Sequence, residues 1–159
     1  MNGKVVGIGL LATGAVAGAG LWYLQEYHYY REVPAAEHPA VLTLPGADGA
    51  DIALPVADYR AIRSISTPIG NRACFRTDPA LAEAATPYPD PTPTAAPRWF
   101  DCFDYGRLTL DIESGAARAW LVAKNIAPKI DSVLAVYPDG RAFIWRQQNE
   151  EAAEKRTID

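Results

Sequence analysis

The sequence has few of the residues on which enzymes and metal sites most often depend. Of its 159 residues, two are histidine and two are cysteine. His28 and His38 both precede the part of the chain that is expected to fold as a domain, and no Cys-x-x-Cys-His motif for haem attachment occurs. A serine, histidine and aspartate triad, a phosphate-binding loop and a spaced set of metal ligands are also absent from the sequence. We therefore expect no catalytic, cofactor-binding or metal-binding residues, and a protein that is not an enzyme.

The chain also lacks a concentration of basic residues. Its 15 lysines and arginines and its 19 acidic residues give a net charge of −4 and are spread along the sequence. Proteins that bind nucleic acid need lysine and arginine clustered on one face, because the phosphate backbone supplies much of the affinity. Nucleic acid is therefore not an expected partner.

One long apolar run is present, close to the amino terminus. Residues 5–24 contain no charged side chain, and about 20 such residues are enough to cross the hydrocarbon layer as a helix. Lys4 and the small residues inside the run also fit a signal peptide, which is the alternative. The run continues past those small residues, however, and aromatic residues like those of a headgroup belt mark its end. They are Trp22, Tyr23, Tyr27, Tyr29 and Tyr30. We expect an uncleaved membrane anchor with its aromatic belt over residues 1–31.

Two features of the chain bear on how the anchor is arranged. Gly14 and Gly18 lie one helical turn apart, and small residues at this spacing let a partner helix approach closely, so they define an expected helix-packing face. Lys4 and the amino terminus put positive charge on one side of the run, which favours an amino terminus in the cytoplasm. The protein is therefore expected in the bacterial inner membrane as a single-pass protein, with its carboxy-terminal domain in the periplasm.

The two cysteines, Cys74 and Cys102, both follow the apolar run. An even pair in an exported domain is typical of a disulfide bond formed in an oxidising compartment. Two unpaired, buried cysteines in a cytoplasmic domain are the alternative. We expect a Cys74–Cys102 disulfide, with a core organised beside it by Trp99, Phe103, Trp120 and Trp145.

The remainder of the chain is long enough for one domain. Prolines make residues 32–40 an expected stalk, the domain itself is expected over residues 41–149, and residues 150–159 form a charged, flexible tail. Turn and cap signals such as Asp139-Gly140 separate the expected elements. Strands are expected over 40–44, within 52–65, and over 72–76, 118–123, 131–137 and 141–147, and short helices over 79–85 and 105–113. The predicted fold class is α+β: one transmembrane helix and a small antiparallel sheet domain that ends in a three-stranded meander.

Residues 86–97, with the sequence TPYPDPTPTAAP, contain five prolines. Such a segment runs as an extended, polyproline-like surface loop, because proline cannot donate to a helix or a central strand. It is either a ligand for a proline-binding groove or a connector whose disorder the disulfide limits. We favour the connector.

Several motifs of the chain are specific enough to indicate a family. They are Arg72–Phe75, Trp99–Phe103, Gly115–Arg118, Lys124–Ile126, and Ile130-Asp131 running into Asp139–Arg141 and Trp145. In these motifs the chain resembles an uncharacterised family of short alphaproteobacterial proteins with a single amino-terminal spanning helix. The resemblance implies a retained anchor and a matched pair of cysteines. Because this is a domain-of-unknown-function family, the resemblance implies no activity, ligand or site.

These observations predict a non-catalytic, membrane-anchored envelope protein. Its periplasmic domain is expected to bind or stabilise a partner protein or a membrane complex, reached through the domain or through the face of Gly14 and Gly18. The alternative is a periplasmic ligand-binding or sensing domain that acts through a partner. That alternative predicts a concave pocket with converging polar groups, and an enzyme would in addition show a cleft with perturbed pKa values.

Overall fold

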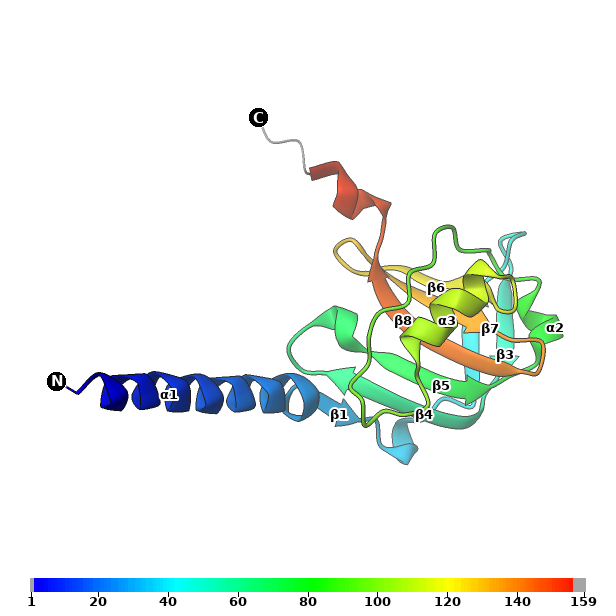
Figure 1. Cartoon of the computed structure of the whole chain (residues 1–159). Helices are drawn as coiled ribbons and strands as arrows, with labels where there is room; N and C mark the ends of the chain where they lie inside the picture. Colours follow the sequence, from blue (N-terminus) through cyan, green and yellow to red (C-terminus); the bar gives the residue numbers. More distant parts are fainter. Residues whose placement is uncertain (1, 156–159) are drawn as a thin grey trace.

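A long apolar helix, α1 (Gly3–Tyr23), projects from a sheet domain in the computed structural model, which describes residues 2–155 (Figure 1). The helix continues to His28 through a wider turn, Leu24–His28. It buries none of its residues against the domain, and a helix that is apolar on every side needs a partner or a lipid environment. Among the described residues it is the one helix long and apolar enough to cross a membrane, a property that signal sequences share.

Six antiparallel strands form the main sheet, in the order β1-β4-β5-β8-β7-β6. The last three strands in the chain form the predicted meander, and the turn between β7 and β8 contains Gly140 at φ +85°. The bounds of the six strands are Tyr30–Glu32 (β1), Ala57–Ser64 (β4), Arg72–Arg76 (β5), Arg118–Ala127 (β6), Ile130–Val136 (β7) and Arg141–Gln148 (β8). The predicted α+β class, with an apolar helix before an antiparallel sheet, is confirmed.

Different elements cover the two faces of this sheet. Helix α3 (Tyr105–Glu113) packs on one face. A two-stranded hairpin packs on the other face together with the short helix α2. The bounds are Val41–Pro45 (β2), Asp51–Pro55 (β3) and Pro79–Ala82 (α2). Adjacent residues of a strand point to opposite faces, so the middle strands of the sheet are apolar on both sides.

The core aromatics that the sequence indicates are divided between these two faces. Trp145 and Phe103 are buried with the residues on the α3 side, whereas Trp120 is buried with those on the hairpin side. Trp99 is only partly buried at the edge of the first cluster. The domain therefore has two cores separated by the sheet, in place of one core beside the disulfide.

Residues 32–40, which were expected to form a stalk, lie against the domain. Glu32 pairs with Ile62 in the sheet, and the Val33 amide donates to the Ala61 carbonyl at 2.9 Å. His38 donates from Nε2 to the Val33 carbonyl at 3.0 Å. Because β1 begins immediately after the turn that ends the apolar helix, the helix and the sheet are joined without a flexible spacer.

The carboxy-terminal segment begins with a short helix. Glu150–Lys155 form a 3-10 helix directly after β8. The flexibility expected for residues 150–159 stays a prediction, and the last four of these residues, 156–159, lie outside the described part of the chain.

Candidate functional site

The Cys74–Cys102 disulfide is formed, with an S–S distance of 2.17 Å and a Cα–Cα distance of 6.3 Å. It joins the middle of β5 to the loop that leads into α3. Cys74 is buried in the core on the α3 side of the sheet, so the bond is structural.

Gly14 and Gly18 lie on the exposed surface of α1, where a β-carbon at either position would have no neighbour within 4 Å. The helix-packing face therefore stays a prediction.

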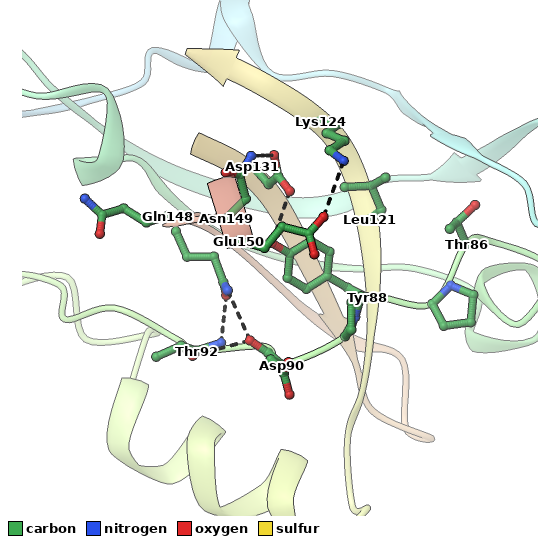
Figure 2. A pocket seen from close by; sticks show the side chains of 13 residues that line it. Thr86, Tyr88, Asp90, Thr92, Leu121, Lys124, Asp131, Gln148, Asn149 and Glu150 are labelled. Atoms are coloured by element: carbon green, nitrogen blue, oxygen red, sulfur yellow. Dashed lines mark hydrogen bonds and ion pairs between the residues drawn. The ribbon is translucent and has the colours of Figure 1, made fainter. Parts of the chain in front are cut away.

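A cavity of about 400 Å³ opens where the proline-rich segment passes from the edge of β6 to the end of β8 (Figure 2). Side chains from segments that are distant in sequence converge on it. Its lining consists of Thr86, Pro87, Tyr88, Pro89, Asp90, Thr92, Leu121, Lys124, Asp131, Gln147, Gln148, Asn149 and Glu150. We take this cavity as the candidate binding site.

The proline-rich segment forms one wall of the cavity and is held by more than the disulfide. At its start the Tyr88 amide donates to the Ala119 carbonyl at 3.0 Å, which pairs the segment with the edge of β6. Further along, Gln147 accepts from the Thr92 amide at 2.7 Å and donates to the Asp90 carbonyl at 3.1 Å. The expectation that little besides the disulfide holds this segment is therefore wrong. Buried polar side chains of the sheet tie it down.

Asp131 is the centre of the polar network in the cavity. Only 3% of its surface is exposed. Its carboxylate accepts from Tyr88 Oη at 3.1 Å, from the backbone N–H of Asn125 at 2.8 Å and from Asn149 Nδ2 at 2.9 Å. Burial, followed by the charge of Asp131, raises the pKa of Tyr88 to about 12. Tyr88 is therefore protonated at neutral pH and acts as a fixed donor.

Unusual backbone conformations surround the same cavity. Asp90, Asn125 and Lys129 have φ values of +50°, +52° and +64°, in the left-handed region that costs most residues about 1 kcal/mol or more. Aspartate and asparagine tolerate this region better than most residues. The Lys129 carbonyl accepts from the amide of Asn149 at 3.0 Å. The fold therefore holds this polar network in one geometry even without a ligand.

Asn149 supplies an acceptor with no partner in the described part of the chain. Asn149 is 7% exposed. Its Nδ2 atom donates to Asn125 Oδ1 at 2.8 Å and also to Asp131. These two bonds fix the orientation of the amide. Its Oδ1 atom is buried and accepts no hydrogen bond from the described residues. One hydrogen bond of this buried network is therefore left unsatisfied within the described residues.

The charges that line the cavity are mainly negative. Asp90, Asp131 and Glu150 contribute carboxylates, and Lys124 is the single basic lining residue, at 3.8 Å from Glu150. In Figure 2 the side chains of Tyr88, Lys124 and Glu150 converge on the same space. Among residues 2–155 the structure brings no group of three or more histidine, cysteine, aspartate or glutamate residues into a metal-binding arrangement. The site is suited to a donor-rich or cationic group.

None of the cavity residues was identified from the sequence. Two signals were available: Tyr88 is the one aromatic residue of the proline-rich segment, and Asp131 is the one charged residue of the segment that forms β7. Neither signal indicates that the two side chains meet, because 43 residues separate them.

The fold and the cavity define a small antiparallel α+β domain that follows an apolar amino-terminal helix and carries a candidate ligand site. Residues 41–156 match a family of unknown function, DUF6446. The match covers well over half of the chain, so the chain belongs to this family. It starts at β2 and leaves α1 and β1 outside, and it confirms the resemblance to a domain of unknown function. Comparison with curated proteins and with solved structures gave no match.

Proposed function

We propose that this protein is a non-catalytic, membrane-anchored envelope protein whose domain binds a partner protein or membrane complex through the cavity of the proline-rich segment. The observation that carries the proposal is the polar network of Asp131, Tyr88 and Asn149. It is buried, rigid and provided with an unpartnered acceptor. Together with the surrounding carboxylates, it recognises a cationic donor group, such as a lysine, an arginine or an amino terminus of the partner.

The position of the cavity supports a partner at the membrane surface. Tyr30, which follows the apolar helix, pairs with Ser64 at one end of the main sheet. Strand β5 pairs with β8 at Ala73 and Ile144, and β8 pairs with β7 at Gln148 and Ile130. Both pairs lie toward that same end of the sheet. The cavity residues at the end of β8 therefore lie at the end of the sheet from which α1 departs, where a neighbouring membrane protein is within reach.

Three features support an uncleaved anchor and an exported domain. The helix surface is apolar and unburied, the helix joins the sheet without a spacer, and the cysteines are disulfide-bonded. In this proposal the amino terminus is cytoplasmic, the domain is periplasmic, and Gly14 and Gly18 provide a second contact for a partner helix.

The test is affinity purification of the full chain from its native membrane in mild detergent, followed by mass spectrometry. The cavity variant combines Asp90→Asn and Glu150→Gln, which remove two carboxylates while keeping side-chain size. The matched control combines Asp58→Asn and Glu113→Gln. Asp58 also has a positive φ, of +53°, and both control residues are exposed away from the cavity lining.

A partner that is recovered with the wild type and the control but lost with the cavity variant supports the proposal. Recovery of the protein alone in all three samples, also after crosslinking, contradicts it. The volume of the cavity is in the range of small-molecule sites, which favours a ligand-binding or sensing domain as the second candidate. A small polyamine such as spermidine that binds the purified wild type, and not the cavity variant, would favour that candidate.

A further inference from the structure

The loop between β4 and β5 (residues 65–71) borders a second depression, separate from the cavity of the proline-rich segment. Asn71 closes the loop by accepting from the Ser64 amide at 3.1 Å. Gly70 approaches Ser64 so closely that a β-carbon on the glycine would overlap that of the serine. Two arginines of the sheet bind the loop. Arg72 donates to the Ile69 carbonyl at 2.6 Å, and Arg146 donates to the Pro68 carbonyl at 2.9 Å. The loop is therefore rigid.

The side chains around this loop suit an anion. A depression of about 470 Å³ is lined by the hydroxyl groups of Ser64, Ser66 and Thr67, by the Asn71 amide, and by Arg63 and Arg146. These groups are hydrogen-bond donors or positive charges at neutral pH.

Positive charge at this site exceeds negative charge. Arg63 is paired with Glu37 at 2.8 Å. In the part of the chain that the structure describes, Arg146 and the buried Arg72 bond to carbonyl oxygens and to no carboxylate. Burial lowers the pKa of Arg146, and the nearby charge of Arg63 lowers it further. An anion bound between these arginines would relieve that repulsion.

The loop lies at the level where the apolar helix leaves the domain. The Ile65 amide donates to the carbonyl of Tyr29, the residue between the helix and β1, at 2.9 Å. Figure 1 shows this loop curling back beside the end of α1. On another side of the junction Trp99 Nε1 donates to the Glu26 carbonyl at 2.5 Å, so the helix end is held from two segments. Ile65 itself is 57% exposed, which places an apolar side chain next to the arginines.

We propose that this loop binds the phosphate of an anionic phospholipid in the membrane leaflet at which α1 emerges. Arg63, Arg146 and the loop hydroxyls would hold the phosphate, and Ile65 would enter the interface beside the acyl chains. Covalent continuity with the apolar helix keeps the site at headgroup depth, which favours a lipid over a soluble phosphate. The inference depends on α1 as an anchor but not on the ligand of the other cavity.

The test uses the full chain in uncharged maltoside micelles and follows hydrogen exchange of the backbone amides of residues 65–71 other than Pro68. The probes are dihexanoyl-phosphatidylglycerol, dihexanoyl-phosphatidylcholine and inorganic phosphate. The site variant combines Arg63→Gln and Arg146→Gln. The matched control combines Arg76→Gln and Arg118→Gln, which remove the same charge at the opposite end of the sheet.

The expected result is protection of the loop by phosphatidylglycerol, with binding at least about tenfold weaker in the site variant and unchanged in the control. Inorganic phosphate that protects the loop equally well would overturn the lipid assignment. An absence of protection with every probe, or an equal loss in site variant and control, would overturn the site itself. Recovery of the chain from its native cells outside the membrane fraction is a separate result that contradicts the anchor.

Discussion

Arg72 holds the proline-rich segment to the sheet, and its replacement is the most direct test of how this domain is built. The side chain is 3% exposed, and its guanidinium donates to four carbonyl groups on two different loops. Two of them, those of Thr94 and Ala95, belong to the proline-rich segment, and the bonds measure 2.9 and 3.0 Å. We expect Arg72→Met to destabilise the domain and to release this segment in particular.

The size of the expected destabilisation follows from the four carbonyl acceptors. Each of them lies on a half-buried or exposed residue, so water can replace part of the hydrogen bonding that the arginine supplied. A loss of about 0.5–1 kcal/mol for each bond corresponds to about 3 kcal/mol in all. The burial of the cation, which lowers the pKa of Arg72 to about 10, is relieved in the variant and offsets some of this loss. The expected decrease in the free energy of unfolding is therefore about 2 kcal/mol.

The assay is urea denaturation of the full chain in detergent, with hydrogen exchange measured over residues 92–97. Arg72→Lys is the informative companion variant, because lysine keeps the charge but cannot reach four carbonyl groups in two directions. We expect Arg72→Lys to lose at least as much stability as Arg72→Met. A loss below about 0.5 kcal/mol in Arg72→Met, or unchanged exchange in the proline-rich segment, would refute the reasoning.

Three further predictions concern stability. Replacing Cys74 and Cys102 with alanine frees a loop whose ends are 28 residues apart and should cost about 3.5 kcal/mol in urea denaturation; an unchanged midpoint would contradict this. Burial, and then interaction with an aspartate, raises the pKa of Tyr88 and of Tyr137 to about 12. In the unfolded chain the pKa of tyrosine is about 10. The two tyrosines therefore contribute fully to the free energy of unfolding below about pH 10, and this contribution should be lost as the pH rises toward about 12. In Tyr88→Phe or Tyr137→Phe the free energy of unfolding should fall less steeply over this range. Gly140 has φ +85°, and Gly140→Ala would put a β-carbon 2.8 Å from the backbone oxygen of Thr77. The change should reduce the free energy of unfolding by about 1–3 kcal/mol, which is measured as a lower midpoint of thermal unfolding.

Local elements could be predicted from the sequence because their causes lie within a few residues. Helix α3 has the predicted bounds, since Asp104 accepts from the Arg107 amide at its start and Gly115 adopts φ +79° after its end. Strand β5 also has the predicted bounds. Helix α2 is shorter than predicted and ends at Ala82, because the chain then turns and Ala85 pairs with Gly46, the residue that follows β2.

The elements whose partners are distant could not be located in the same way. Residues 32–40 contain two prolines and look like a linker in sequence, yet β1 and Val33 bind β4. The division of the core into two clusters also depends on which strands are neighbours, since the place of β5 beside β8 brings together residues about 70 apart in the chain.

The sequence by itself determined the apolar helix, the α+β class, the meander and the choice of cysteines, because hydrophobic periodicity, turns and caps are local properties. Only the tertiary structure decided where charge and hydrogen bonds converge. Tyr88 meets Asp131 and Thr92 meets Gln147 across separations of 43 and 55 residues, and Arg146 reaches Pro68 across 78. Each of these contacts requires the strand order β4-β5-β8-β7-β6, and no short stretch of the chain encodes that order.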